Sequence, residues 1–278
     1  MSSTSEIKGT LDSWEANADF WDEKMGADGN EYWSLLQKPY LHKLIDVQPG
    51  CRVLDLATGN GMASRFLAGR GASVVATDGS VRMLKNCRER CTPEEAERMS
   101  YAQLDVTKPA DFDDFLKSPL AEGGFDVVVI NMAIMDVETL DPLADALPKL
   151  LKTSGIFVAT MLHPVFFTSG ATRVVEVVTD PTTGEYYDVR GKVIRSYMKV
   201  APWRGVFVNG QPAHQLYFHR PLHELFGVFF KRELVMDALE EPSFTEEDAE
   251  VRQVQRAESH RNYTQIPPIM AFRMRKIN

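Results

Sequence analysis

Short apolar runs alternate with amphipathic stretches of helical period from Cys51 onward. The apolar runs predict strands over 51–56, 73–77, 99–104, 125–130 and 155–161. Strands that are separated by helices pair in parallel, because a crossover of this length returns the chain to the same end of the sheet. The pattern therefore predicts an α/β fold, a doubly wound sheet with helices on both faces.

Each of these runs ends at a polar residue, and the set is Asp55, Asp78, Asp105, Asn131 and His163. The carboxyl ends of parallel strands line one crevice, where ligands of such sheets bind. The spacing therefore predicts a ligand site along this edge.

The first run leads through a small-residue turn with Gly59 and Gly61 straight into a helical pattern. A loop without bulky Cβ groups lets a ligand approach the backbone amides. A dinucleotide is one candidate, because Gly59-x-Gly61 is half of the G-x-G-x-x-G fingerprint. The third small position is Ser64, however, and the Asp55 carboxylate would repel a pyrophosphate. The stretch favours a ligand with a cationic group, and a nicotinamide-dependent oxidoreductase is the alternative.

Two segments flank or interrupt this core. Aromatic and apolar residues over 14–45, broken by Gly26, Gly29 and Pro39, predict two or three short helices after a disordered start over 1–12. Between the fifth run and a helix near 221–231, β-branched residues flank a turn at 180–184 and predict a hairpin, followed by an extended run over 211–219. Residues 244–265 are polar, and we expect them to be mobile. The division expected is a helical segment over 1–49, an α/β core over 50–163, a β-rich insertion over 164–220, and the rest of the core over 221–278.

Composition narrows the class of protein. The chain has 278 residues and a net charge of −8, which gives little electrostatic support for binding nucleic acid. Its cysteines are Cys51, Cys87 and Cys91, without zinc-ligand spacing, which favours a reducing compartment. The longest apolar run, 127–135, is too short to span a bilayer. These features predict a cytoplasmic protein without a membrane or nucleic-acid partner.

The turn also resembles motif I of the class I S-adenosylmethionine (SAM)-dependent methyltransferases, with Ala57 where the first glycine is usual. Further matches to that family are Asp78, Leu104-Asp105-Val106, 125–131 and 155–158. Segments 163–166, 218–222, 240–244 and 266–268 are similar to a small-molecule subfamily found in microbes. The resemblance implies a Rossmann-like seven-stranded sheet, closed by strands over 234–239 and 269–274, with the last strand antiparallel.

The resemblance also implies a site. Cofactor-binding residues would be Trp21, Asp55, Ala57, Gly59, Gly61, Asp78, Gly79, Met83, Asp105, Val106, Asn131, Met132 and Met135. Asp78 would hold the ribose hydroxyls and Asp105 the adenine edge. The N-terminal helices would form a lid that places Trp21 or Trp33 against the sulfonium or the acceptor. The insertion would cover the acceptor with the aromatic residues Phe166, Phe167, Trp203 and Tyr217, or else form its own core or a homodimer contact.

The implied chemistry mainly requires positioning, because the methyl group of SAM is already activated on a sulfonium. A phenol, N-hydroxyl or amine acceptor also needs a base, and histidine titrates in the right range. His163 is the candidate base, with His219 and His214 as alternatives. Asp105, Asn131 and Asp136 could imitate the metal set of catechol-type enzymes, but Asp105 is better used at the adenine edge, so no metal is expected. The residues after the fourth predicted strand, Asn131-Met132-Ala133-Ile134, lack the Pro-Pro motif of nucleobase amino-methyltransferases. This argues against DNA or RNA as a substrate.

The function expected is methyl transfer from SAM, with S-adenosylhomocysteine as product, to a small, planar, apolar and aromatic acceptor of secondary metabolism. The hydroxyl oxygen is the preferred position, and nitrogen or carbon are alternatives. A SAM-fold binding protein without catalysis is a further alternative from a different class.

Overall fold

The computed structural model describes residues 9–250 and 259–277. Its centre is a seven-stranded sheet in the order β10-β11-β5-β4-β1-β2-β3, in which β11 is antiparallel to both of its neighbours. The predicted fold class is confirmed. The strands of this sheet are β1 (Arg52–Leu56), β2 (Ser73–Asp78), β3 (Met99–Gln103), β4 (Phe125–Asn131), β5 (Leu151–Leu162), β10 (Leu234–Glu240) and β11 (Ile269–Lys276).

The apolar runs form buried strands because their side chains alternate between two cores. Leu54, Val128 and Phe157 pack on one face of the sheet, whereas Val53 and Val127 pack on the other. Strand β5 begins at Leu151, earlier than predicted, since a register shift beside Phe125 lets Leu151 pair with it at the end of the preceding helix.

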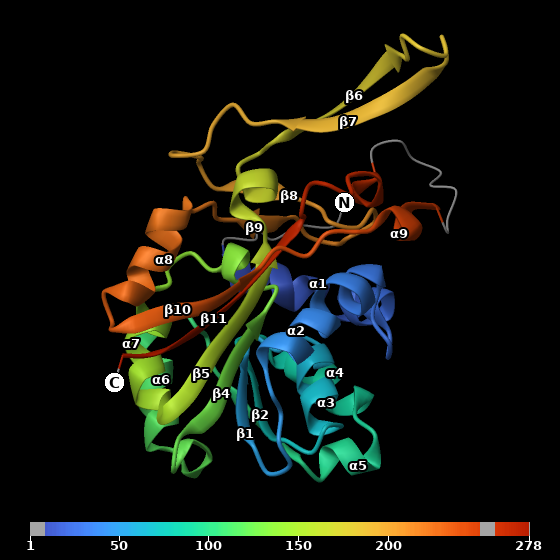
Figure 1. Cartoon of the computed structure of the whole chain (residues 1–278). Helices are drawn as coiled ribbons and strands as arrows, with labels where there is room; N and C mark the ends of the chain where they lie inside the picture. Colours follow the sequence, from blue (N-terminus) through green and yellow to red (C-terminus); the bar gives the residue numbers. More distant parts are fainter. Residues whose placement is uncertain (1–8, 251–258, 278) are drawn as a thin grey trace, which may run out of the picture.

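Helices cover the two faces of the sheet separately (Figure 1). One face carries α6 (Pro109–Lys117), α7 (Asp141–Leu150) and α8 (Leu222–Phe230). The other carries α2 (Lys38–Leu44), α3 (Met62–Ala68), α4 (Val81–Arg90) and α5 (Pro93–Ala96). Short 3-10 helices are η2 (Pro119–Ala121), η3 (Ile134–Asp136) and η5 (His260–Asn262). In the part of the chain that the structure describes, no helix is long and apolar enough to cross a membrane.

The N-terminal segment is helical, as predicted, and lies at the carboxyl edge of the sheet. It consists of α1 (Thr10–Met25), the π-helix η1 (Tyr32–Gln37) and α2. The expectation of disorder over 1–12 falls mainly on residues outside the described ones, but it is wrong for Thr10 and its successors, which begin α1. Of the stretch 244–265, residues 251–258 also lie outside the described ones, and Glu246–Glu250 form α9.

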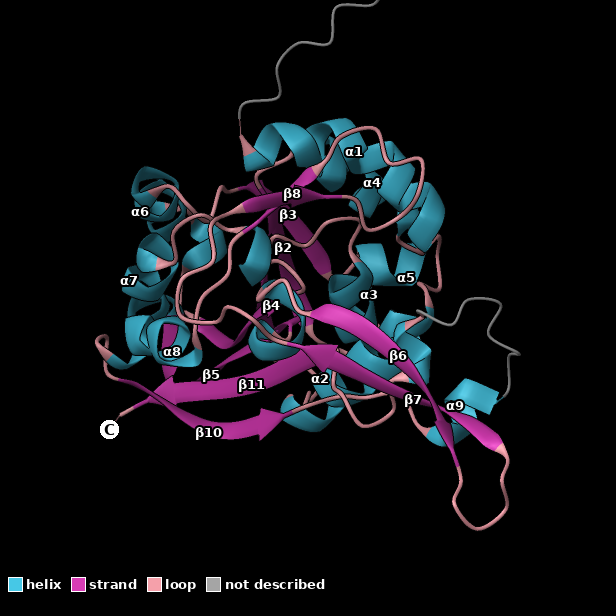
Figure 2. Ribbon diagram, turned by 90° about the horizontal axis from the view of Figure 1, so that it is seen from above, coloured by secondary structure: helices cyan, strands magenta, loops and turns pink. Residues whose placement is uncertain are grey.

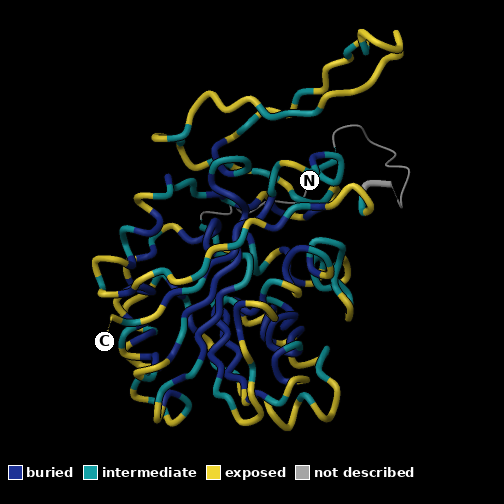
Figure 3. Tube along the Cα trace, viewed as in Figure 1, coloured by how far each residue is buried: buried dark blue, intermediate teal, exposed yellow. Residues whose placement is uncertain are grey.

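The insertion after β5 contains a π-helix, η4 (Pro164–Thr168), and two separate two-stranded sheets. The predicted hairpin is β6 (Thr172–Thr179) with β7 (Tyr186–Val193), and it projects away from the core (Figure 1). Its residues are mostly exposed (Figure 3). The second sheet pairs β8 (Trp203–Gly205) with β9 (Gln215–Tyr217), so the extended run predicted over 211–219 is shorter than expected. Seen from above, β8 lies over the end of the central sheet near α1 (Figure 2).

Candidate active site

A cavity of about 390 Å³ lies at the carboxyl edge of the sheet, enclosed by α1, η1 and β9. Its size is in the range of small-molecule sites. The floor comes from the strand ends, and its lining includes Ala57, Gly59, Asp78, Gly79, Met83, Asp105, Val106, Asn131, Met132 and Met135. The structure therefore brings most of the predicted cofactor residues into one cavity.

The glycine loop after β1 adopts the left-handed backbone that its small residues permit. Ala57 has φ 51°, Gly59 has φ 59° and Gly61 has φ 85°. Gly61 does not line the cavity, but it begins α3, and a Cβ there would lie 2.4 Å from Cys87 Sγ. Gly61 is therefore needed for both conformation and packing.

Asp55 lies beneath this loop and not in the cavity, contrary to the expectation that it faces a cationic ligand group. It is fully buried, and its Oδ2 accepts hydrogen bonds from Thr58 Oγ1 at 2.7 Å and Ser64 Oγ at 2.6 Å. Burial raises its pKa to about 6, because the charged form loses its hydration. These hydrogen bonds indicate that Asp55 stabilises the conformation of the glycine loop.

Asp78 lines the cavity at the last residue of β2. Its Oδ2 accepts from the Gly59 backbone N–H at 2.9 Å, and its Oδ1 accepts from Ser80 N–H at 2.9 Å. Burial raises its pKa to about 6 although both hydrogen bonds favour the carboxylate. Each oxygen keeps a further lone pair, so the carboxylate can accept two hydroxyl groups from a ligand.

Asp105 and Val106 line the next part of the cavity. Burial opposes ionisation of Asp105, but hydrogen bonds from Thr107 and from Lys108 outweigh it and lower the pKa of the carboxyl group. Asp105 is thus an anion held in place at the end of β3.

The end of β4 is fixed by bonds to two other elements. Asn131 Oδ1 accepts from Thr160 Oγ1 at 2.6 Å, and Asn131 Nδ2 donates to Gln37 Oε1 at 3.1 Å. Met132 has φ 56° and donates its N–H to the Thr160 carbonyl at 2.9 Å. These bonds hold Met132 and Asn131 at the cavity and attach η1 to the sheet.

Aromatic side chains form the roof. Trp21 contacts Trp14 and Phe207 at ring-centroid distances of 5.6 and 5.8 Å, and Phe207 contacts Tyr32 at 5.7 Å. All four side chains line the cavity, together with Tyr217. Such a lining favours a flat, largely apolar ligand.

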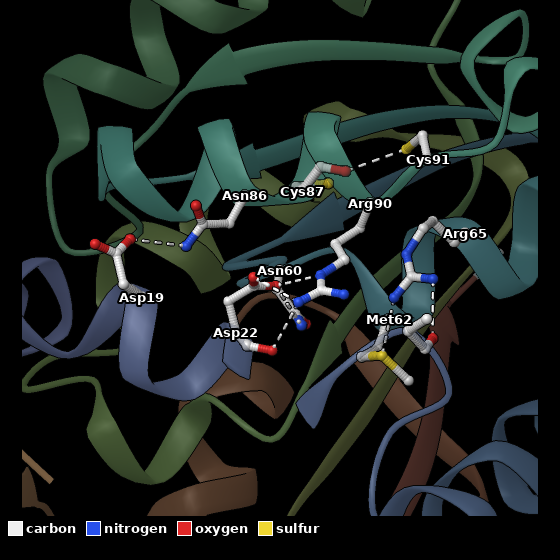
Figure 4. A network of polar contacts seen from close by, with 10 residues as sticks. Asp19, Asp22, Asn60, Met62, Arg65, Asn86, Cys87, Arg90 and Cys91 are labelled. Carbon is white, nitrogen blue, oxygen red and sulfur yellow. Dashed lines mark hydrogen bonds and ion pairs between the residues drawn. The ribbon is translucent and has the colours of Figure 1, made fainter. Parts of the chain in front are cut away.

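Helix α1 is fastened to α4 and to the glycine loop by a polar network (Figure 4). Arg90 binds both carboxylate oxygens of Asp22, at 2.8 Å to Oδ1 and 2.9 Å to Oδ2. Asn60, from the loop, donates to the same Asp22 at 3.3 Å, and Asn86 donates to Asp19 at 3.4 Å. The roof helix therefore depends on charge pairing with the core.

Neither predicted catalytic histidine lines the cavity. His163 is 2% exposed, its Nε2 lies 2.8 Å from Glu241 Oε1, and its Nδ1 accepts from Val165 N–H at 3.2 Å. His219 Nδ1 lies 3.0 Å from Thr168 Oγ1, and its Nε2 donates to the Tyr197 carbonyl. Burial lowers the pKa of both imidazoles. Both rings are engaged in polar contacts outside the cavity, so the structure does not bring either histidine to the predicted ligand site.

Most of the predicted acceptor residues also pack elsewhere. Trp33 is buried against Phe66, Phe166 lies on His163, and Phe167 stacks on His260 at 4.6 Å. Trp203 stacks on Tyr217 at 4.5 Å, and of the predicted set only Tyr217 lines the cavity.

Several lining residues were not predicted as site residues. They include Trp14, Tyr32, Gln37, Asp136, Phe207 and Gln215. Asp136 is 5% exposed, and its Oδ1 has no hydrogen-bond partner. In the sequence, Asp136 is a carboxylate among mostly apolar residues over 132–140. It was considered above only as part of a set that could imitate a metal site.

Residues 54–159 match the model of a methyltransferase domain. This segment is thus similar to a methyltransferase domain. Among curated relatives, the magnesium-protoporphyrin O-methyltransferase of Rhodobacter capsulatus is 39% identical over 25% of this chain and 31% of its own length. The demethylmenaquinone methyltransferase of Thermobifida fusca is 34% identical over 40% of this chain and 43% of its own length. The chain thus spans about a third to a half of the length of these relatives.

Solved structures agree on the fold of the chain. An S-adenosylmethionine-dependent methyltransferase from Mesorhizobium loti superposes with a TM-score of 0.64, at 21% identity, over 90% of this chain and 100% of its own. The glycopeptide N-methyltransferase MtfA, solved with SAM, has a TM-score of 0.54 at 13% identity, over 86% of this chain and 92% of its own. The family resemblance drawn from motif I and the strand ends is confirmed.

Proposed function

We propose that the protein transfers the methyl group of SAM to a hydroxyl oxygen of a small, planar, largely apolar acceptor and releases S-adenosylhomocysteine. The observation that supports this proposal most is the hydrogen bond from the Gly59 N–H to Asp78, at the floor of a cavity with an aromatic roof. The floor offers paired acceptors for a ribose, and the roof offers flat apolar surface.

The residues present fit SAM. Asp78 can accept both ribose hydroxyls, and Gly79 leaves space beside it. Leu104, Val106 and Met83 provide apolar contacts for a flat base beside the Asp105 end of β3. SAM supplies an activated methyl group, and the task of the protein is to position the acceptor and to exclude water.

The acceptor class is supported by the roof and by the names of relatives. Trp14, Trp21, Tyr32 and Phe207 enclose the upper cavity. Two relatives are named for magnesium-protoporphyrin and demethylmenaquinone, each of which contains a planar ring system. Nitrogen or carbon acceptors are the alternative positions of methylation.

We place this reaction in secondary metabolism in the cytoplasm. The support for the compartment is that Cys51, Cys87 and Cys91 are free thiols. We expect no nucleic-acid partner, because the chain has a net charge of −8.

The test is incubation of the protein with SAM labelled in its methyl group and a metabolite extract of the source organism, followed by mass spectrometry of the labelled product. A labelled aromatic methyl ether is the expected result. A thermal shift with S-adenosylhomocysteine but not with NADPH separates this proposal from an oxidoreductase. A shift without any methyl transfer would instead favour the binding protein, and label on macromolecules alone would contradict the small acceptor.

A further inference from the structure

The cavity contains a buried carboxylate to which the proposed binding of SAM assigns no role. Asp136 ends the 3-10 helix after β4, lines the cavity and is 5% exposed. Its backbone N–H donates to the Ala133 carbonyl at 2.8 Å, whereas its side-chain Oδ1 has no partner. A buried polar atom without a partner costs free energy, so its presence in a ligand cavity points to a ligand group that supplies the missing hydrogen.

The facing wall does not supply that hydrogen. Gln215 and Tyr217 of β9 line the cavity beside Asp136, and the Phe218 N–H donates to the Met135 carbonyl at 2.7 Å, which holds β9 against the 3-10 helix. The Tyr217 hydroxyl donates its proton to Gln215 Oε1 at 2.7 Å. Burial and the charge of Asp136 both raise the pKa of Tyr217, so this tyrosine stays neutral and its hydrogen stays engaged.

The charged residues among the described lining all carry the same sign. They are Asp78, Asp105, Asp136 and Glu138, and the described lining includes no lysine, arginine or histidine. An anionic acceptor would meet these like charges without a lysine, arginine or histidine to pair with, at a cost that burial increases. The lining therefore favours a neutral acceptor with a hydrogen-bond donor.

We propose that Asp136 binds the acceptor hydroxyl through Oδ1 and takes up its proton, and that the acceptor is a neutral phenol or enol without a carboxylate or phosphate. This inference rests on the proposed methyl transfer. In the step, a lone pair of the acceptor oxygen forms the new O–CH₃ bond, and the electron pair of the broken S–CH₃ bond stays on sulfur. The hydroxyl proton passes to Asp136, which later releases it to solvent.

The charge balance of this step suits a buried site. A cation and a carboxylate are both neutralised as the ether forms, so the charge buried in the cavity decreases toward products. Burial also raises the pKa of Asp136 well above its usual range, which makes the carboxylate a stronger proton acceptor.

The test compares the wild-type protein with Asp136→Asn and Asp136→Ala. Asp113→Asn is the matched control, because Asp113 is an exposed carboxylate on α6 away from the cavity lining. Binding of S-adenosylhomocysteine is measured first by titration calorimetry, and we expect all four proteins to bind it within about threefold. The probes are then 2-naphthol, its methyl ether and 2-naphthoate, each titrated at saturating S-adenosylhomocysteine.

Wild type and Asp113→Asn should bind 2-naphthol at least about tenfold more tightly than the ether, as expected for one hydrogen bond to a charged group, and should bind 2-naphthoate most weakly. Both Asp136 variants should lose the preference for naphthol over its ether. Three results would overturn this inference but not the proposed function. They are equal preference in wild type and the variants, tight binding of naphthoate, and no binding of any probe in the presence of S-adenosylhomocysteine. A wild-type protein that does not bind S-adenosylhomocysteine would overturn the proposed function and this inference with it.

Discussion

The Asp78 carboxylate accepts the backbone N–H of Gly59 at 2.9 Å, so the end of β2 holds the loop that follows β1. The same side chain is exposed to the cavity, where it can accept hydroxyl groups. Loop geometry and ligand binding therefore depend on one carboxylate.

Replacing Asp78 should weaken cofactor binding strongly. In Asp78→Asn one oxygen becomes an amide donor that faces donor groups of Gly59 or Ser80. We expect the affinity for S-adenosylhomocysteine to fall about 10- to 100-fold, as for hydrogen bonds to a charged group. Titration calorimetry measures this, with Asp113→Asn as the charge-matched control. An unchanged dissociation constant would contradict the ribose role.

Cofactor affinity should also depend on pH. Burial raises the pKa of Asp78 to about 6, so the carboxylate is lost as pH falls through this value. Binding of S-adenosylhomocysteine should be constant above about pH 7 and weaken below about pH 6, with the slope reduced in Asp78→Asn. Burial also raises the pKa of Asp55 to about 6 and the pKa of Asp136 well above its usual range, so a slope that remains in the variant reports these two carboxyl groups. Affinity that improves at low pH would show that the acid form binds better.

Asp136→Asn should stabilise the protein at high pH. Burial raises the folded-state pKa of Asp136 above its unfolded value, so the wild-type stability is greatest below the unfolded pKa and decreases as pH rises through the folded one. The amide has no charge to bury. Melting curves at pH 4 and pH 8 should give similar Tm values at pH 4 and a Tm higher by a few degrees for the variant at pH 8. An equal difference at both pH values would argue against an ionisable Asp136.

Gly61→Ala should destabilise the fold through two separable effects. The residue has φ 85°, and the new Cβ would lie 2.4 Å from Cys87 Sγ. Positive φ costs about 1–2 kcal/mol and overpacking about 1–3 kcal/mol more. Gly184→Ala, with φ 76° and open space around the Cβ position, should show only the first cost. Chemical denaturation measures both, and a Cys87→Ala background should relieve the second cost of Gly61→Ala.

Arg90→Ala should loosen the roof helix. Arg90 binds Asp22 with two hydrogen bonds, and both side chains are partly buried. We expect faster amide exchange over α1 and a several-fold loss of S-adenosylhomocysteine affinity. Arg82→Ala removes the more exposed pair with Asp19, and such pairs contribute about 0–1 kcal/mol, so it should have the smaller effect. Equal effects would show that burial of the pair is unimportant.

The sequence predicted the floor of the site well because parallel strands end at one edge. Asp78, Asp105 and Asn131 come at or just after such ends, and all three line the cavity. Asp55 lies one residue before the end of β1, where the loop covers it, so its different role follows from a shift of one position.

The residues of the roof and the proposed proton acceptor, Asp136, could not be predicted from the same pattern. His163 follows β5 directly, but its N–H donates to the Pro268 carbonyl and its ring turns to Glu241, a contact set by a segment far along the chain. Asp136 lies in a three-residue 3-10 helix, which is too short to show a periodic pattern of apolar residues in the sequence. Phe207 lies in an irregular loop, where periodicity gives no information.

Asn17 of α1 donates to the Ala213 carbonyl at 2.9 Å and accepts the Ala213 N–H at 2.8 Å, although the two residues are separated by 196 positions. Helix α1 and the loop before β9 are consequently one structural unit made from two segments that are far apart in the sequence. To exchange the cavity roof with that of a protein of similar fold, both segments would have to be transplanted together, since either one alone would leave a buried amide without its hydrogen-bond partner.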